Sequence, residues 1–286
     1  MKFSLILCTL GRYKEVKEFL DSLKEQTYKD FELIVVDQNE NDKLKLLMEN
    51  YKLYFDIKYF KVNFKGLSKA RNFGLKYVNG DIVAFPDDDC KYFPNTLRNV
   101  ANFFKRHPDI DFLSGLPVDE NFNSSASYFL NKRTEIKGKN VLKTITSYTI
   151  FIRKKSLKNI RFDEQLGVGS KFGSAEETDF IYNIIRKGER GMYIPDVIKV
   201  YHSNKAICNE YTIKKAAYYA LGFGAFFKKN FILTRDWELF PSFLRYMVMS
   251  SFIRIIFSTA RFNLCEIKVH TVTLVNKWKG FLKYKR

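Results

Sequence analysis

The sequence predicts an α/β fold in which helices flank a mostly parallel, doubly wound sheet. Short apolar runs alternate strictly with amphipathic helical segments through about residue 118, which is typical of strands linked by crossover helices. The runs are apolar on consecutive residues, as expected for parallel strands that are covered on both faces. Polar residues follow three of these runs directly, and such sheets bind ligands beyond the carboxyl ends of their strands.

The first half of the chain supplies the strand and helix signals in order. Strands are expected over residues 4–9, 31–37, 57–62, 82–85 and 112–118. Helices are expected over residues 13–26, 44–51 and 66–78, where apolar residues recur at helical spacing. Asn79 and Gly80 form a normal helix stop. Pro94 suits the first position of a fourth helix, which leads into the strand over 112–118.

Residues beyond 118 give a less regular pattern. The segment 119–138 is rich in Asn, Ser and Lys and predicts a loop, whereas 147–153 resembles a strand. Glycines and serines over 167–174 predict a flexible stretch before a helix that begins near Glu176. The last expected strand covers 197–201, with His202 at its end.

The charge is concentrated near the end of the chain. The formal net charge is +18, and residues 211–286 hold 14 Lys or Arg against 3 Asp or Glu. Aromatic and aliphatic residues are interleaved with these cations, which predicts either helices in a membrane interface or a helical subdomain with a basic outer face. Arg245 and Arg254 interrupt the longest apolar run, so a transmembrane helix is not expected. We expect a first domain over 1–205 and a helical region over 206–286.

The cysteines and the N-terminus indicate the compartment. Cys8, Cys90, Cys208 and Cys265 are scattered and form no zinc-binding pattern, so buried or free thiols in a reducing environment are expected. The N-terminal apolar run is too short for a signal peptide. Together with the basic tail, these features predict a cytoplasmic protein that lies peripherally on the inner face of the membrane.

Three consecutive carboxylates, Asp87, Asp88 and Asp89, follow the apolar run 82–85 and Pro86. Like charges at the end of a buried strand raise the cost of ionising one another. A divalent cation such as Mg²⁺ or Mn²⁺ removes that cost and can bridge to substrate phosphates. The alternative is a solvated acidic turn.

Five motifs in order carry a family resemblance: S-L-I-L-C-T-L-G-R, V-V-D-Q-N-E-N-D, G-L-S-K-A-R-N-F-G-L, G-D-I-V-A-F-P-D-D-D and A-E-E-T-D-F. Over roughly residues 1–205 the chain resembles a family 2 glycosyltransferase of the GT-A fold. The resemblance implies transfer of a sugar from a nucleotide-diphosphate donor, usually with inversion. The basic tail is similar to that of members that build surface polysaccharide on lipid-linked acceptors.

The resemblance also implies roles for nucleotide-binding residues. Thr9 and Arg12 match the loop that borders the nucleotide, and Arg71 matches a residue near the diphosphate, where a guanidinium suits phosphate. Asp37 matches the acidic residue that binds a uracil-type base, so a UDP- or dTDP-sugar is expected. Gln38 stands where the family usually has a second Asp, which leaves the base identity open.

The metal-binding residues follow from the same resemblance. Asp87 is expected to approach the ribose or the metal, Asp88 lies beside it in the nucleotide site, and Asp89 is expected to hold the metal against the diphosphate. His202 matches a position that completes the metal shell in some relatives, although a lone His is often structural. The metal would be Mn²⁺ or Mg²⁺ and would act as a Lewis acid.

The general base is expected in the pair Glu176 and Glu177, which matches the family's Glu-Asp motif at a helix start. Glu177 is one methylene longer than the Asp that the family has there. The alternative is that Glu176, Glu177 and Asp179 only stabilise the helix N-terminus.

Two other functions fit part of the sequence. A nucleotidyltransferase acting on nucleic acid would also use clustered carboxylates and excess cations. The cations, however, lie in an apolar tail far from the acidic motif, so we expect an anionic membrane surface and a glycan or lipid-linked acceptor as partners, and no nucleic acid. A non-catalytic nucleotide-sugar-binding protein is the third possibility.

Overall fold

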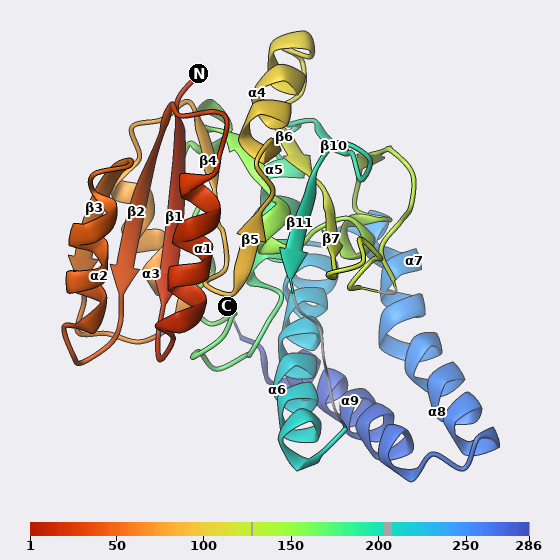
Figure 1. The fold of residues 1–286 in the computed structure, drawn as a ribbon. Helices are drawn as coiled ribbons and strands as arrows, with labels where there is room; N and C mark the ends of the chain where they lie inside the picture. Colours follow the sequence, from red (N-terminus) through yellow and green to blue (C-terminus); the bar gives the residue numbers. More distant parts are fainter. Residues whose placement is uncertain (127, 203–207, 286) are drawn as a thin grey trace.

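The computed structural model describes residues 1–126, 128–202 and 208–285, and its strands form two sheets (Figure 1). The larger sheet has the order β3-β2-β1-β4-β9-β6-β10-β8, and the smaller one has the order β5-β11-β7. The strands of the larger sheet are β1 (Phe3–Thr9), β2 (Phe31–Asp37), β3 (Asp56–Lys61), β4 (Ile82–Ala84), β6 (Phe112–Ser114), β8 (Thr134–Ile136), β9 (Phe151–Arg153) and β10 (Gly191–Tyr193). Those of the smaller sheet are β5 (Cys90–Tyr92), β7 (Leu116–Val118) and β11 (Lys199–His202).

Helices cover both faces of the larger sheet and continue into the C-terminal region. They are α1 (Lys14–Lys24), α2 (Lys43–Tyr51), α3 (Leu67–Gly74), α4 (Thr96–Arg106), α5 (Glu176–Ile185), α6 (Glu210–Phe227), α7 (Phe240–Phe243), α8 (Ser250–Ala260) and α9 (Leu264–Lys283). The expected parallel half is confirmed, because β1 pairs in parallel with both β2 and β4, and β2 pairs with β3. β9 lies antiparallel between β4 and β6, so the complete sheet is mixed.

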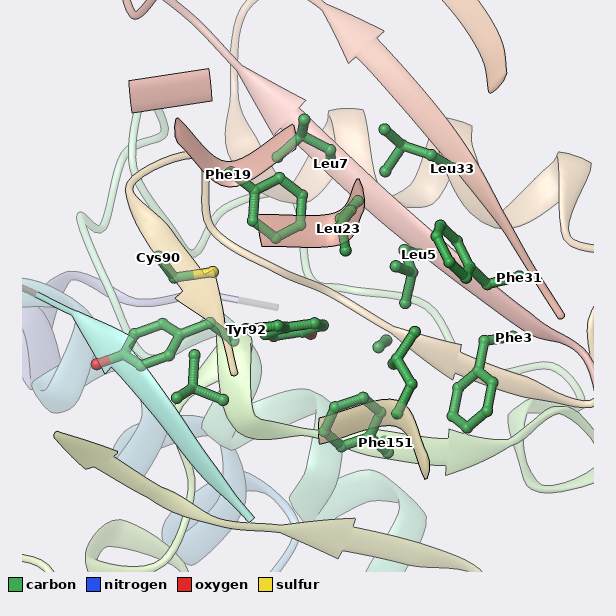
Figure 2. Close-up of a cluster of buried hydrophobic side chains, with 14 of the residues drawn as sticks. Phe3, Leu5, Leu7, Phe19, Leu23, Phe31, Leu33, Cys90, Tyr92 and Phe151 are labelled. Carbon is green, nitrogen blue, oxygen red and sulfur yellow. The ribbon is translucent and has the colours of Figure 1, made fainter. Parts of the chain in front are cut away.

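The side chains of β1 alternate between two cores. Phe3, Leu5 and Leu7 pack on the face that α1 covers, together with Phe19 and Leu23 of that helix (Figure 2). Ile6 and Cys8 pack on the opposite face. Every residue of β1 is buried, which explains why its sequence is apolar without interruption.

Some predicted boundaries were wrong, and packing explains the clearest case. The expected strand 112–118 divides at Gly115 into β6 and β7, which belong to different sheets. A Cβ at Gly115 would lie 2.3 Å from the Ile198 carbonyl oxygen, so the chain turns where only glycine fits. The expected loop 119–138 contains β8. Of the expected strand 147–153, only residues 151–153 form a strand, and α4 begins at Thr96 rather than at Pro94.

The C-terminal region is helical, as expected, and α6 packs closely on α9. A Cβ at Gly224 would lie 1.9 Å from the Lys277 carbonyl oxygen, and one at Gly280 would lie 2.0 Å from that of Leu221. The cysteine prediction was wrong for Cys208 and Cys265, which form a disulfide. The close packing of α6 and α9 brings together the segments that carry these two residues, which are 57 positions apart in sequence. Cys8 and Cys90 are buried free thiols, as expected.

One helical run in the described chain, Trp237–Ala260, is long and apolar enough to cross a membrane by length and composition. Arg245 and Arg254 lie within this run, so the expectation that it forms no transmembrane helix stays a prediction. Only 22% of its most apolar window is buried in the protein. The run combines a 3₁₀ turn over Trp237–Leu239, α7, a π-helical turn over Leu244–Met249 and α8. Its exposed residues include Phe252, Ile256 and Phe257.

Candidate functional site

The three aspartates lie in the turn between β4 and β5, at the carboxyl end of β4. Asp88 is buried and accepts hydrogen bonds from Thr9 Oγ1 at 2.7 Å and from Arg12 Nη1 at 2.6 Å. Asp89 contacts Arg12 Nη1 at 2.5 Å through one carboxylate oxygen and His202 Nε2 at 3.3 Å through the other. The first-strand loop, the acidic turn and the end of β11 therefore meet in one place.

Arg71 joins the acidic turn to the glutamate pair. Its fully buried guanidinium donates from Nη2 to Asp87 Oδ1 at 2.9 Å and from Nη1 to Glu176 Oε1 at 3.0 Å. Ser147 Oγ donates to the same oxygen of Asp87 at 2.8 Å. The structure thus joins Asp87 of the acidic turn to Glu176, which is far from it in sequence, through one buried cation.

The backbone around the glutamate pair is held in an unusual conformation. Ala175, directly before α5, has φ of 68°, in the left-handed region that non-glycine residues rarely adopt. Such conformations cost roughly 1–3 kcal/mol and cluster at functional sites. The preceding glycine-rich loop, predicted to be flexible, is anchored to α3, because Leu67 N donates to the Val168 carbonyl and Ser68 Oγ to the Leu166 carbonyl.

Burial and neighbouring charges set the ionisation of the site. Burial raises the pKa of Glu177 to about 8, and the charge of Glu176 adds to this shift. Burial also raises the pKa of Glu176, although Arg71 opposes the shift. Burial raises the pKa of Asp88 to about 6 against the opposing effects of Arg12 and Thr9. With a pKa of about 8, Glu177 binds a proton more strongly than an ordinary glutamate.

Asp89 and His202 stabilise each other's charged forms. Burial opposes ionisation of Asp89, but the hydrogen bonds from His202 and Arg12 outweigh it and lower its pKa below the usual value. Burial likewise disfavours the imidazolium of His202, yet Asp89 raises the pKa of this histidine overall. The ring of Tyr148 stacks on His202 with centroids 4.7 Å apart and so fixes the imidazole plane.

Asp37 lies beside Thr9 in the β1–β2 register and is fully buried. It accepts hydrogen bonds from Asn39 N and Nδ2 at 2.8 and 2.7 Å and from Tyr59 OH at 2.6 Å. Asn39 in turn accepts from Gly11 N, so Asp37 organises the two loops next to the acidic turn. Its contact with a nucleotide base stays a prediction.

Sequence reasoning missed four residues that hold the site together: Asn39, Tyr59, Ser147 and Tyr148. Asn39 had a local signal, because Asp followed two residues later by Asn is typical of an Asx-turn. The other three had none, since Tyr59 reaches Asp37 across the sheet and Ser147 and Tyr148 lie in a turn before an antiparallel strand.

The donor set fits a divalent cation at Asp89 and His202. A carboxylate oxygen and an imidazole nitrogen face each other at 3.3 Å, and both side chains are partly exposed. These are ligands that Mn²⁺ accepts, and such ions often take their remaining ligands from water and substrate phosphates. Asp87 instead faces Arg71 and Ser147, and over the described residues no three His, Cys, Asp or Glu side chains converge into a complete metal shell.

Comparison with known proteins settles the family. The sequence model described as "Glycosyl transferase family 2" matches residues 4–161, which is more than half of the chain. The chain belongs to glycosyl transferase family 2. The matched range contains Thr9, Arg12, Asp37, Arg71 and the three aspartates, whereas the glutamate pair and His202 lie beyond it.

Curated relatives of this family 2 chain include a teichoic acid biosynthesis protein and a glucosyltransferase. It is 28% identical over 274 residues to the minor teichoic acid biosynthesis protein GgaB of Bacillus subtilis, covering 86% of this chain and 28% of GgaB. It is 30% identical over 211 residues to the GalNAc(5)-diNAcBac-PP-undecaprenol beta-1,3-glucosyltransferase of Campylobacter jejuni, covering 70% of this chain and 64% of that enzyme. The chain thus spans little more than a quarter of GgaB.

Solved structures confirm the fold. Staphylococcus aureus TarS 1–349 in complex with UDP superimposes with a TM-score of 0.62 at 21% identity, covering all of this chain and 93% of that one. The mannosyltransferase PcManGT of Pyrobaculum calidifontis, in complex with GDP-Man and Mn²⁺, gives a TM-score of 0.71 at 16% identity, covering all of this chain and 88% of that one. The predicted GT-A fold of family 2 is confirmed.

Proposed function

We propose that this chain transfers a sugar, with inversion, from a nucleotide-diphosphate sugar to a hydroxyl of a glycan or lipid-linked acceptor in surface-polysaccharide synthesis. The observation that carries the proposal is the pair of hydrogen bonds from Arg71. They join Asp87, which lies on the proposed diphosphate side, to Glu176, which neighbours the proposed general base Glu177. The donor is a UDP- or dTDP-sugar by resemblance, and TarS, of the same fold, binds UDP. Family membership and the chemistry of the relatives favour this function over nucleotidyl transfer to nucleic acid and over a non-catalytic role.

The site has a nucleotide side and an acceptor side, and different residues act on each. Thr9, Arg12 and Asp88 shape the nucleotide side, where Arg12 offers a guanidinium to the diphosphate. A divalent cation held by Asp89 and His202 would stabilise the negative charge that develops on the departing nucleotide diphosphate. PcManGT, of the same fold, is seen with Mn²⁺ and a nucleotide sugar.

Glu177 supplies the general base on the acceptor side. As the acceptor oxygen forms its bond to the anomeric carbon, the bond from that carbon to the diphosphate oxygen breaks, and Glu177 takes the hydroxyl proton. Attack from the face opposite the leaving group inverts the anomeric centre. Its raised pKa makes Glu177 a stronger base than an ordinary glutamate once it is ionised.

Thermal-shift titration tests the donor site. We expect UDP with Mn²⁺ to raise the melting temperature by several degrees, because ligand at about 100 times its Kd adds roughly 2.7 kcal/mol to the folded state. Asp89→Asn should raise the Mn²⁺ concentration needed for half of this shift at least tenfold, since one of two protein ligands is weakened. Asp109→Asn, at an exposed ion pair with Arg190, is the matched control. An unchanged Mn²⁺ requirement in Asp89→Asn would contradict the metal assignment.

The C-terminal helices are proposed to bind the anionic surface of the inner membrane face. Ile256 and Phe257 are 66% and 62% exposed on α8, and Phe252 and Ile253 lie on the same helical face one turn earlier. Arg254 stands among them and is more than 4 Å from every carboxylate in the described chain. Apolar side chains interleaved with unpaired cations match the chemistry of an anionic lipid interface.

Vesicle binding tests this surface. We expect the protein to sediment with vesicles that contain anionic glycerophospholipid and to be released by salt, and the double variant Ile256→Asp, Phe257→Asp should bind at least about tenfold more weakly. Leu53→Asp is the control, because Leu53 is also a highly exposed apolar residue but lies in the turn after α2. Equal sedimentation of the α8 variant and the wild type would rule out this face.

A further inference from the structure

A largely buried ionic cluster connects the C-terminal region to the helix that carries the glutamate pair. Lys229 lies in the π-helical turn Lys228–Leu233 that follows α6. Its Nζ is 2.8 Å from Asp179 Oδ2 and 2.8 Å from Asp163 Oδ2. Asn230 Nδ2 donates to the other oxygen of Asp179 at 2.8 Å, and Tyr284 OH donates to Asp163 at 2.6 Å.

The cluster reaches the first turn of α5, where catalysis is proposed. Asp179 is fully buried, lies two residues after Glu177, and donates its backbone N–H to the Ala175 carbonyl at 2.9 Å. The C-terminal region also contacts the segment before the glutamate pair, because Ser174 Oγ donates a hydrogen bond to the Tyr219 carbonyl of α6 at 2.6 Å. A Cβ at Gly222 would lie 2.2 Å from the Ser174 carbonyl oxygen, so α6 approaches this backbone directly.

Stability alone does not account for a buried cluster of this kind. Burial lowers the pKa of Lys229, but the carboxylates of Asp179 and Asp163 outweigh it, so the ammonium stays charged. A buried ion pair typically gives little net stability relative to apolar side chains of the same volume, because both charges lose their hydration. Its directional contacts do fix where the partner groups lie.

We propose that Lys229, with Asn230 and Tyr284, is a positioning element that holds the N-terminal turn of α5 so that Glu177 faces the acceptor hydroxyl. This inference rests on the proposed function for the role of Glu177, and on the observed contacts for the fixation of α5. It makes the C-terminal region a part of the active site as well as a membrane-facing surface.

The experiment compares full-length variants with a neighbouring lysine as control. Lys229→Met should lower kcat about 10- to 50-fold, because a base displaced by about 1 Å loses up to a hundredfold, while donor KM and the Kd of UDP stay within about twofold. Lys228→Met removes the same charge from a lysine that lies over the ring of Phe281 and should keep wild-type kcat. Lys229→Arg, which can still pair with both carboxylates, should recover most of the loss.

Hydrogen exchange supplies a readout that needs no turnover. Amides of residues 175–180 should exchange at least about tenfold faster in Lys229→Met than in Lys228→Met. If Lys229→Met does not fold, Tyr284→Phe removes only one hydroxyl and should show the same two effects at about a third of the size. Wild-type kcat and exchange in the folded variants would overturn the positioning role. If the wild type turns over no nucleotide sugar but the two lysine variants still differ in exchange, the proposed function is refuted. The fixation of α5 by Lys229 would then still be established.

Discussion

Replacing Glu177 with glutamine is expected to lower kcat for sugar transfer by about 10²- to 10⁴-fold, the usual contribution of a general base. Glutamine keeps the size and the hydrogen-bonding reach of the side chain but cannot accept the acceptor's proton. The nucleotide side is separate from Glu177, so the Kd of UDP with Mn²⁺ should remain within about twofold of the wild type. Radiolabelled transfer from a nucleotide sugar, with the acceptor saturating, measures the effect.

The pH dependence of wild-type turnover provides an independent check. Because burial raises the pKa of Glu177 to about 8, the side chain is largely protonated at neutral pH, and only its ionised form can accept a proton. Turnover should therefore rise with pH and level off above about 8. In Glu177→Gln the residual rate should lose this rise, and a persistent rise would assign it to a different group.

The same substitution should stabilise the protein. The pKa of Glu177 is higher in the folded chain than the ordinary value of 4.5, so the folded state holds a proton that the unfolded state releases between these two values. Stability from this group is complete below about pH 4.5 and is lost as the pH rises toward 8. Glu177→Gln avoids the loss, so at pH 8 its melting temperature should exceed that of the wild type by several degrees, with no gain at pH 4.5.

The positions of the chemically important residues were accessible from sequence because they follow from strand ends. Thr9 and Asp37 end two buried apolar runs, and Asp87 follows the third after Pro86. Parallel pairing of β1 with β2 and β4 then places them along one edge of the sheet. Periodicity alone therefore predicts the parallel half of the fold and the edge of the sheet at which the proposed site lies.

Pairing between distant side chains was not accessible in the same way. Periodicity shows that a residue is buried but does not show its partner, so neither the stacking of Tyr148 on His202 nor the disulfide between Cys208 and Cys265 could be predicted. The division of 112–118 at Gly115 depends on Ile198, which directly precedes β11 and lies far later in sequence. Each of these three features is a contact of long sequence separation.

Arg71→Met is expected to have the largest effect on stability, a loss of about 3–5 kcal/mol, because removal of one partner leaves buried charges uncompensated. Arg71 is 1% exposed, and its guanidinium is shared between Asp87 and Glu176 above the ring of Phe162. Methionine fills most of the volume, so the loss reports mainly on the carboxylates. Denaturant unfolding at pH 7 measures it, and transfer activity should fall with the loss of the bridge.

The pH dependence of this loss separates an electrostatic cause from a packing defect. Arg71 now opposes the effect of burial on the pKa of Glu176, and in its absence that pKa rises further. The folded variant would then keep a proton that the unfolded chain releases above about pH 4.5, so its stability deficit should grow as the pH rises from 5 to 8. Adding Glu176→Gln to Arg71→Met removes one of the carboxylates left without a cation. The double variant should recover part of the stability deficit at pH 8 but little at pH 5. A deficit that is constant with pH would instead mean that Arg71 stabilises the fold by packing. Its charge would then not be what links Asp87 to Glu176.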